Sequence, residues 1–362
     1  MDIIQRNTIA LLRTSLFNAP IGIEPMTEKQ WQKLFTNTKE HAVTALCFDA
    51  LSLIPSNLQP PRELLFQWAM YANDTENNFQ KRKEVAAKLT AAMRNDGVNI
   101  LVIKGFSVAK YYPQPAHRES CDLDIVSFDG FHKVNVFVGS RGVSVDCHNE
   151  RHSVFTIEGV MIENHSRFLY NRDSDELRME KFLETEGLKS CAEATTKPVA
   201  LCQPLANALF FLKHAEQHFV YSLPGRLSIE LRTLCDWAIL LNSKSFNYID
   251  LKHLIQGTSI DIFADLLTRV CIKTFGLSDS WENNLHSIPD KIVNQCQRLI
   301  VAYKNPNENR HDFVGKSTRF IKYLRYSKFF RFVFSRSIFA NYYSFFRKNS
   351  NGHIDVKSEN SE

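Results

Sequence analysis

The sequence of 362 residues predicts an α+β fold, in which a small mixed sheet is flanked by mainly helical N- and C-terminal regions. Apolar residues recur at helical spacing before residue 97 and again after residue 171, which predicts helices at both ends. Short apolar or alternating runs, punctuated by glycine and proline, fill the stretch between and predict strands. Because strands and helices alternate over residues 99–167, this stretch is expected to form the sheet domain.

The N-terminal region contains two segments with clear helix signals. A helix is predicted over residues 27–46, and two prolines at 60–61 then break the chain. A longer helix is predicted over 62–95, because its apolar residues recur at helical spacing and Gly97 follows as a helix stop.

The middle region begins with the apolar run 99–103 (NILVI), which predicts a buried strand. Lys104-Gly105 ends this strand, and a short helix is expected over 106–112. The run 121–127 (CDLDIVS) alternates acidic and apolar residues, as a strand with two different faces does. The remaining predicted elements are a helix over 130–141 and strands over 143–148, 153–158 and 160–165.

The C-terminal region carries five predicted helices, over 204–220, 227–241, 249–255, 260–275 and 290–303. In the second of them, Arg232 and Asp236 are expected to form an ordinary ion pair four residues apart. The final residues, 349–362, are polar and are expected to be disordered. We therefore divide the chain into an N-terminal helical region (1–97), a core (98–170), a C-terminal helical domain (171–313), a basic aromatic segment (314–348) and a tail (349–362).

The composition is that of an ordinary globular protein, with 44% hydrophobic and 23% charged residues. The eight cysteines are scattered without a CxxC pair, which favours free thiols in a reducing compartment. Residues 1–18 lack the features of a signal peptide, and no run approaches the ~18 apolar residues of a membrane span. These features predict a cytoplasmic protein.

Asp122-Leu123-Asp124 is the strongest chemical signal in the sequence. Side chains alternate along a strand, so the two acids share one face while Leu123 and Ile125 point into the core. Two carboxylates this close repel each other unless a cation holds them, and Mg²⁺ prefers oxygen ligands. Since a solvated edge strand would show the same pattern, the surrounding residues are needed to distinguish a metal site from such a strand.

Three features around this pair favour a phosphate-handling site. Lys104-Gly105 precedes a predicted helix, where a glycine lets the backbone approach a phosphate and free N–H groups attract an anion. Arg118, four residues before Asp122, could grip a triphosphate with its planar guanidinium. Glu163 lies between apolar neighbours on a later predicted strand and can supply a third carboxylate.

The order IKG, a short helix with YYP, R-x-x-x-DLDIV and a hairpin ending in IENH resembles the bacterial uncharacterised nucleotidyltransferase family of the DNA polymerase β superfamily. The resemblance extends from the N-terminal helices to the later FLKHAEQHF and LR-x-x-x-D-W helices. It implies a polymerase β-like sheet with a glycine turn at Gly105, two acids at Asp122 and Asp124, and a third acid at Glu163.

The resemblance also implies an activity: metal-dependent transfer of a nucleoside monophosphate from a nucleoside triphosphate to a hydroxyl or phosphate acceptor, releasing pyrophosphate. Mg²⁺ (or Mn²⁺) would be the cofactor. The acceptor is open among a small molecule, a glycan, a protein and RNA. The catalytic and metal-binding residues would be Asp122, Asp124 and Glu163, and the triphosphate-binding residues Lys104, Gly105, Ser107 and Arg118.

Two departures from the superfamily pattern leave alternatives open. The turn lacks the usual Gly-Gly or Gly-Ser, so Ser107 or Lys104 would have to compensate. Asp146 also lies on a predicted strand and is an alternative third ligand, although the IENH motif favours Glu163. A catalytically degenerate protein that binds nucleotide without turnover is therefore the alternative function.

Several histidines lie near these motifs. His214 and His218 are four residues apart on a predicted helix, but HAEQH differs from the H-E-x-x-H zinc motif, so we expect them to pack beside the sheet domain. His148, His152 and His165 crowd the hairpin near the third acid, either as strand-edge residues or as substrate contacts.

The segment 314–348 contains nine Lys or Arg and no Asp or Glu, interleaved with aromatic residues. That combination suits peripheral contact with an anionic inner membrane, and it also suits RNA. It equally suits a terminal helix whose aromatic residues pack on the protein body while the charges stay in water. A membrane- or RNA-associated protein of the same fold is therefore a further alternative.

Overall fold

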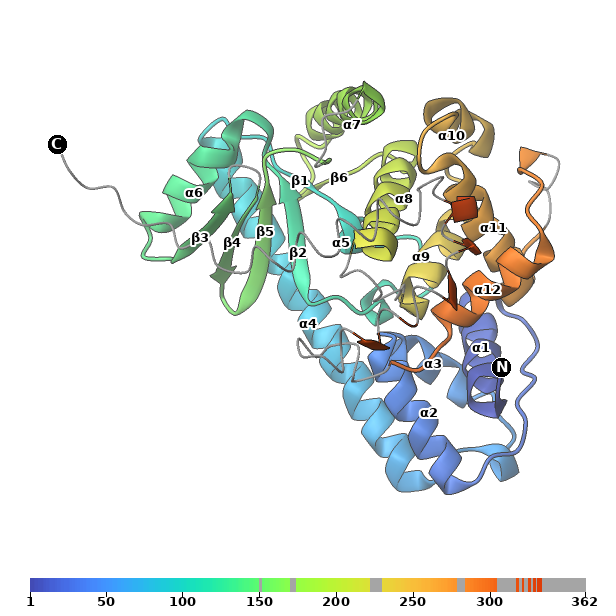
Figure 1. Cartoon of the computed structure of the whole chain (residues 1–362). Helices are drawn as coiled ribbons and strands as arrows, with labels where there is room; N and C mark the ends of the chain where they lie inside the picture. Colours follow the sequence, from blue (N-terminus) through green and yellow to red (C-terminus); the bar gives the residue numbers. More distant parts are fainter. Residues whose placement is uncertain are drawn as a thin grey trace.

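The N-terminal region is helical, as predicted (Figure 1). It comprises α1 (Ile3–Phe17), α2 (Glu28–Glu40), α3 (Thr44–Leu51), the 3₁₀ turn η1 (Ser56–Leu58) and α4 (Arg62–Asn95). Asp2 and Thr27 begin α1 and α2 with reciprocal capping boxes. The predicted helix over 27–46 is two helices, because the chain turns at Ala42, whose φ is +52°.

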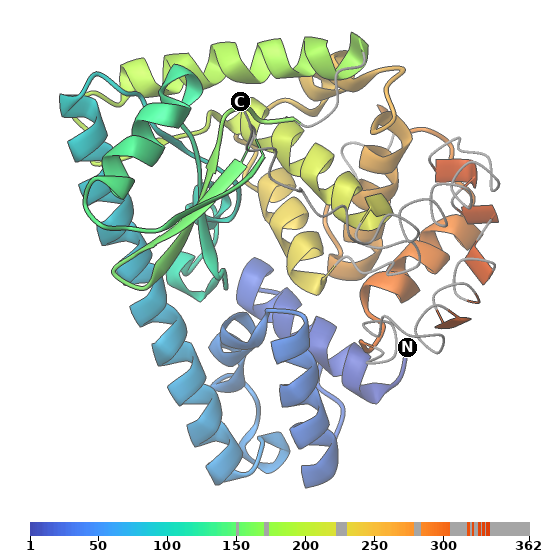
Figure 2. The same ribbon diagram turned by 60° about the vertical axis from the view of Figure 1, so that its left-hand side comes forward.

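Helix α4 joins this region to the sheet. Its first half contributes Leu64 and Trp68 to the core of the N-terminal helices. Its second half contributes Val85 and Leu89 to a second core beneath the sheet. Figures 1 and 2 show α4 running from the N-terminal helices at the bottom along the sheet at the top. One continuous helix therefore packs in both the N-terminal helical region and the sheet domain. The predicted domain boundary near residue 97 stays a prediction.

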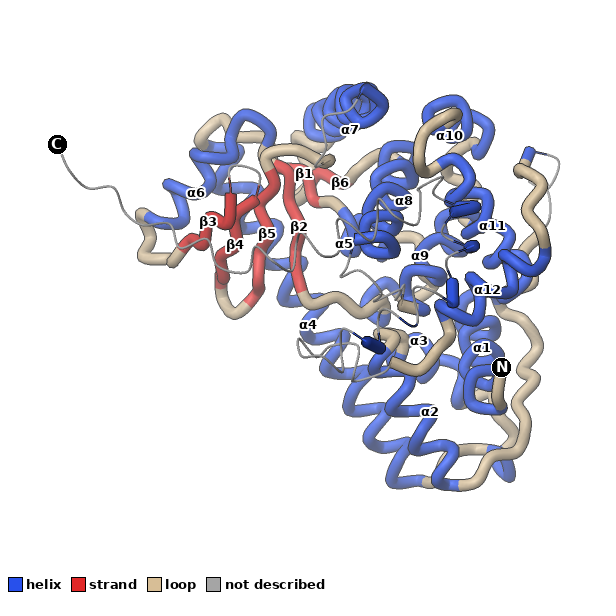
Figure 3. Tube along the Cα trace, viewed as in Figure 1, coloured by secondary structure: helices blue, strands red, loops and turns tan. Residues whose placement is uncertain are grey.

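The middle of the chain forms a six-stranded mixed sheet, which confirms the predicted α+β class (Figure 3). Its strand order is β3-β4-β5-β2-β1-β6. β2 is parallel to β5, and β1 is parallel to β6, while the other neighbours are antiparallel. The strands are β1 (Leu101–Val102), β2 (Asp122–Val126), β3 (Val145–Asn149), β4 (His152–Ile157), β5 (Val160–His165) and β6 (Ala200–Leu201).

The two faces of the sheet differ sharply in character. Leu123, Ile125 and Ile162 are buried in the core that the sheet shares with α4 and with α6 (Phe131–Gly139). Side chains alternate along each strand, so the acids of β2 and β5 lie on the opposite face. The connections between strands include α5 (Lys104–Ala109) and the 3₁₀ turns η2 (Pro115–His117) and η3 (Phe128–Gly130).

The C-terminal region is helical and packs beside the sheet and the N-terminal helices (Figure 1). The predicted helix over 227–241 begins at Leu231, and residues 222–229 lie outside the described part of the chain. The helices are α7 (Ser174–Glu193), α8 (Pro204–Tyr221), α9 (Leu231–Asn242), α10 (Tyr248–Ile255), α11 (Asp261–Phe275) and α12 (Asp290–Ile300).

The computed structural model describes residues 1–149, 152–169, 174–221, 230–278, 284–304, 317–318, 321, 325–326, 328–329 and 331–333. The predicted tail 349–362 and most of the basic aromatic segment 314–348 lie outside these residues. At the described positions of that segment, Phe329 is buried with its ring centroid 5.7 Å from that of Phe219, whereas Lys328 and Arg331 are exposed. No helix in the described ranges is long and apolar enough to cross a membrane.

Candidate functional site

The register of the sheet brings the acidic residues together. Asp124 on β2 lies directly opposite Glu163 on the parallel neighbour β5, and Asp122 lies opposite Met161. Directly paired residues share a face, and neighbouring strands are about 4.8 Å apart. Asp122, Asp124 and Glu163 therefore form a carboxylate cluster on the face that points away from the core shared with α4.

Asp146, the alternative third acid, lies on the same face but farther along the sheet. It is opposite Val154 on β4, which in turn is opposite Glu163. Three strand spacings separate it from Asp124, or about 14 Å. Its side chain is exposed. The geometry thus places Glu163, and not Asp146, beside Asp124.

The ammonium group of Lys104 lies within the carboxylate cluster. Its Nζ is 2.5 Å from Oδ1 of Asp124 and 3.5 Å from Oε2 of Glu163. Lys104 has a φ of +52°, a left-handed conformation that costs a non-glycine residue about 1 kcal/mol or more. The preceding Ile103 is held in place, since its backbone N–H donates to the carbonyl of Asp124 at 3.0 Å. The strained turn directs a cation at the two acids.

Two stacked histidines border the same carboxylates. His165 Nε2 is 3.1 Å from Oδ1 of Asp124 and 3.5 Å from Oε2 of Glu163, and the residue is 3% exposed. His152 Nε2 is 3.7 Å from the same Glu163 oxygen. The two rings stack with centroids 5.2 Å apart. The side chain of His148, the third histidine of the hairpin, lies outside the described part of the chain.

The neighbouring charges shift the pKa values of the three acids in different directions. Burial alone would raise the pKa of Asp124, but Lys104 and His165 hold that pKa well below its ordinary value. The hydrogen bond from His165 is the main cause of the lowered pKa of Glu163. Burial, followed by the negative charge of Asp124, raises the pKa of Asp122. Asp124 and Glu163 are thus held as carboxylates, as metal ligands must be.

Helix α8 carries two further histidines within electrostatic reach of this site. His214 and His218 have Nε2 atoms 3.1 Å apart. Burial, and next the charge of Lys104, lowers the pKa of both imidazoles, and the charge of Asp124 also acts on each. Both imidazoles are therefore neutral near pH 7 and able to accept a proton or a hydrogen bond.

Arg118 is occupied by a partner within the protein. Its buried guanidinium donates to both carboxylate oxygens of Asp236 on α9, at 3.0 and 2.7 Å. A Cβ built on Gly105 would lie only 2.2 Å from Nη1 of Arg118. Arg118 thus anchors the loop before β2 to α9, and Gly105 makes room for it, while the roles predicted for both residues in binding a triphosphate stay predictions.

Two other expectations change for similar reasons. Asp236 also accepts a hydrogen bond from Tyr112 at 2.7 Å, while Arg232 lies 3.2 Å from Glu230, so the predicted pair of Arg232 with Asp236 is wrong. Ser107 is fully buried, and its hydroxyl has no hydrogen-bond partner among the described residues. Its predicted role in binding a phosphate stays a prediction, and in this structure the hydroxyl is shielded from solvent.

Arg82 is a cation near the site that the sequence analysis missed. It lies on α4 three residues after Phe79, whose ring stacks on Phe106 of α5 with centroids 5.2 Å apart. The side chain is 5% exposed, and no hydrogen bond or ion pair reaches it from the described residues. Burial lowers its pKa, against the opposing charge of Asp122. Its only sequence signal is its place on the buried stripe of a long amphipathic helix.

A second cluster of possible metal ligands, Asp261, Asp265 and His286, lies among the C-terminal helices. Lys252 binds both of its aspartates, and Asp265 also accepts a hydrogen bond from the hydroxyl of Tyr248 at 2.8 Å. Every acid in this cluster thus has internal partners, and the network joins α10 to α11.

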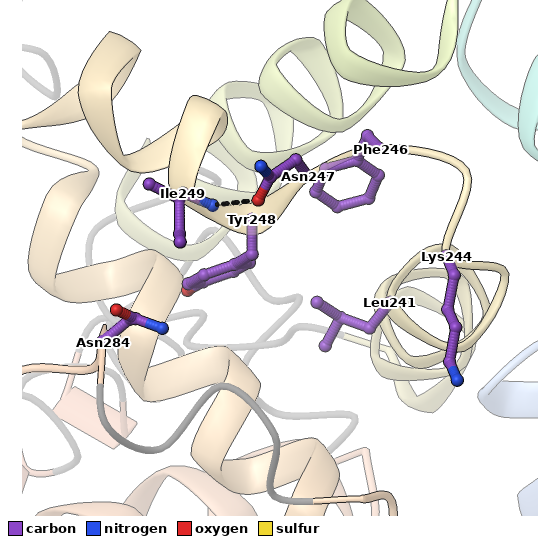
Figure 4. A pocket seen from close by; sticks show the side chains of 7 residues that line it. All are labelled: Leu241, Lys244, Phe246, Asn247, Tyr248, Ile249 and Asn284. Atoms are coloured by element: carbon purple, nitrogen blue, oxygen red, sulfur yellow. Dashed lines mark hydrogen bonds between the residues drawn. The ribbon is translucent and has the colours of Figure 1, made fainter.

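A pocket of about 260 Å³ opens beside Tyr248, between the end of α9 and the start of α10 (Figure 4). Asn247 at its edge accepts a hydrogen bond from the backbone N–H of Ile249 at 2.9 Å, as Figure 4 shows. This side chain caps α10, so the polar edge of the pocket is accounted for by the helix start.

Comparison with known proteins identifies a family for this chain. Residues 27–276 match the model of a family described as uncharacterised nucleotidyltransferase. The match runs from the start of α2 to the end of α11 and includes the whole sheet. No curated protein and no solved structure matches the chain significantly.

Proposed function

Because the chain belongs to the uncharacterised nucleotidyltransferase family, we propose that it transfers a nucleoside monophosphate from a nucleoside triphosphate to a hydroxyl or phosphate acceptor, releasing pyrophosphate. The resemblance inferred from its motifs is confirmed at the level of that family. The observation that carries the proposal is the position of Asp124 directly opposite Glu163, with Asp122 on the same face. Two adjacent strands thus present three carboxylates on one face of the sheet.

The donor set fits a divalent cation. Asp122 and Asp124 would hold Mg²⁺ or Mn²⁺ from β2, and Glu163 would complete the ligands from β5. Bound there, one or two such ions supply the charge that stabilises the attacking and leaving oxygens of a phosphoryl displacement. An ammonium group already lies among these oxygens, which supports the view that the cluster accommodates a cation.

The remaining residues would position the triphosphate and balance its charge. Lys104 is the nearest cation to the acids, and Arg82, buried on α4, is a second one within electrostatic reach of Asp122. We assign the triphosphate to this pair and not to Arg118, whose guanidinium is occupied by Asp236. Transfer of a phosphoryl group depends mainly on such positioning and charge stabilisation.

Pyrophosphate release with each of the four nucleoside triphosphates tests this proposal. The wild-type chain would be incubated with Mg²⁺ or Mn²⁺ and cell extract as the acceptor source. Wild type and Asp146→Asn are expected to release pyrophosphate, because Asp146 lies about three strand spacings from Asp124. Asp124→Asn and Glu163→Gln are expected to release none. Equal release from all four proteins would contradict the proposal.

A second candidate function is nucleotide binding without turnover. The observation that favours it is the Lys104 ammonium, which lies where a catalytic cation would be needed. This candidate predicts that a triphosphate binds with the same dependence on Lys104 and Arg82, yet no pyrophosphate appears with any extract. Calorimetric titration of the nucleotides, run beside the release assay, separates the two functions.

A further inference from the structure

The donor atoms of Asp124, Glu163 and His165 are spaced like adjacent ligands of a single metal ion. His165 Nε2 is 3.1 Å from Asp124 Oδ1 and 3.5 Å from Glu163 Oε2. An ion about 2.1 Å from each ligand separates adjacent ligands by about 3.0 Å in octahedral geometry and about 3.4 Å in tetrahedral geometry. The 3.1 Å spacing falls between these values, the 3.5 Å spacing lies just above the tetrahedral one, and all three donor atoms lie within 4.8 Å of one another, so little movement is needed to coordinate an ion.

The nitrogen ligand is held rigidly in this position. His165 follows Glu163 by two residues on β5, so both side chains leave the same face. On its other side His165 is paired in register with His152 on β4, and the two rings stack at an angle of 24°. Strands hold ligands more precisely than loops do. His152 Nε2, 3.7 Å from the Glu163 oxygen, is a second imidazole within reach of the same ion.

The same space already holds a positive charge. Nζ of Lys104 is 2.5 Å from Asp124 Oδ1, 3.5 Å from Glu163 Oε2 and 3.5 Å from His165 Nε2. An ammonium group and a metal ion cannot both lie at the centre of these three atoms. Binding of an ion therefore requires the lysine side chain to leave, and the freed ammonium can then pair with a phosphate.

The chemistry of the donors selects the ion. Mg²⁺ prefers oxygen ligands and retains several waters, whereas imidazole ligands favour first-row transition metals. We propose that Asp124, Glu163 and His165 form a tridentate site for one transition-metal dication, such as Mn²⁺, Fe²⁺, Co²⁺ or Zn²⁺, which displaces the Lys104 ammonium and is preferred over Mg²⁺. The inference rests on the site of the proposed function and names its ion, but it concerns binding and does not require turnover.

Co²⁺ and Mn²⁺ report this site directly, without an activity assay. Visible absorption of the Co²⁺-loaded full-length chain gives affinity and geometry, and pulsed electron paramagnetic resonance of the Mn²⁺-loaded chain detects coupling to a ligand nitrogen. We expect tight binding of one ion with nitrogen coupling, which a hundredfold excess of Mg²⁺ does not displace. Displacement by equimolar Mg²⁺, or the absence of nitrogen coupling, would overturn the inference.

Three variants assign the site. His165→Gln should reduce the nitrogen coupling, since His152 then remains within reach, and should weaken Co²⁺ binding by roughly tenfold or more, since even a lost outer-shell partner costs about 10–100-fold. Lys104→Met should tighten Co²⁺ binding in the absence of nucleotide, because the competing ammonium is gone. A damaged fold would instead weaken Co²⁺ binding. Lys104→Met therefore still tests the site if His165→Gln is unstable. His286→Gln, in the second cluster, should change nothing, and loss of the signal in that variant would place the ion elsewhere.

The outcomes also separate this inference from the proposed function. Transition-metal binding with nitrogen coupling, but no pyrophosphate release with any ion, would uphold the site and refute the transfer reaction. Pyrophosphate release supported by Mg²⁺ in a protein whose Mn²⁺ shows no nitrogen coupling would uphold the reaction and refute the site.

Discussion

Gly105→Ala tests what the glycine after Lys104 does for the structure. The added methyl carbon would lie 2.2 Å from Nη1 and 2.9 Å from Cζ of Arg118. Non-bonded heavy atoms require about 3.5 Å, so the guanidinium must move by more than about 1 Å. It cannot do so and keep both hydrogen bonds to Asp236, which are 3.0 and 2.7 Å long. The substitution therefore breaks a buried ion pair.

The expected loss of stability follows from that geometry. Breaking a buried pair and leaving one charge uncompensated costs about 3–5 kcal/mol. That is a large share of the roughly 5–15 kcal/mol that stabilises a typical protein. If Gly105 served only to let a phosphate approach, alanine would change stability by about 1 kcal/mol or less, because its φ is not in the left-handed region.

Urea denaturation followed by tryptophan fluorescence measures this loss. Gly139→Ala is the matched control, because its Cβ would meet nothing within 4 Å, and it should change stability by about 1 kcal/mol or less. In a background in which Arg118 and Asp236 are replaced by Met and Leu, Gly105→Ala should cost little. A change below about 1 kcal/mol in the wild-type background, or an equal loss in both backgrounds, would refute the reasoning.

Two further predictions concern stability alone. His117 bridges Asp49 and Glu76, with both N···O distances 2.7 Å, and although burial opposes it, these acids raise the pKa of His117. This stabilisation is complete below about pH 6.5 and is lost as the pH rises through the folded pKa of His117. His117→Gln should therefore lower the free energy of unfolding by about 1–3 kcal/mol near pH 6 and by less toward pH 9, whereas exposed His132→Gln should show no such trend. A loss of stability that does not depend on pH would contradict this prediction. Lys213→Met leaves two buried glutamates facing each other without the ammonium that binds both, at 2.7 and 2.8 Å, and should lower the free energy of unfolding by about 3–5 kcal/mol in the same assay; an unchanged midpoint would contradict the pairing.

Local patterns in the sequence predict much of this fold. Alternation in CDLDIVS and in the hairpin strands identifies β2, β4 and β5, and it places Asp122 and Asp124 on one face, because the period of a strand is local information. Glycine and proline mark the ends of the long helix α4 correctly. Strand β6 (Ala200–Leu201) was not predicted, since two residues are too few to show a period.

The arrangement of the candidate site depends on contacts between distant residues. The parallel pairing of β2 with β5 sets Asp124 opposite Glu163, and no local pattern encodes that register. Arg118 finds its partner 118 residues away on α9, which its spacing from Asp122 could not reveal. The position of His165 two residues after Glu163 on a strand could have shown that its side chain lies beside these acids. The left-handed turn at Lys104, by contrast, could not be predicted, because lysine rarely adopts that conformation.

The central claim is that the carboxylates of β2 and β5 support nucleotidyl transfer, and the fate of the α-phosphate tests it most directly. The wild-type chain would be incubated with a nucleoside triphosphate labelled at the α-phosphate, divalent metal and cell extract, and the label followed by chromatography. The account predicts that the label moves to an acceptor with wild type and Asp146→Asn, and stays in the triphosphate with Asp124→Asn. Label transferred equally by Asp124→Asn would contradict the account, and so would α-label that appears only in the nucleoside diphosphate, because that result marks transfer of the γ-phosphate.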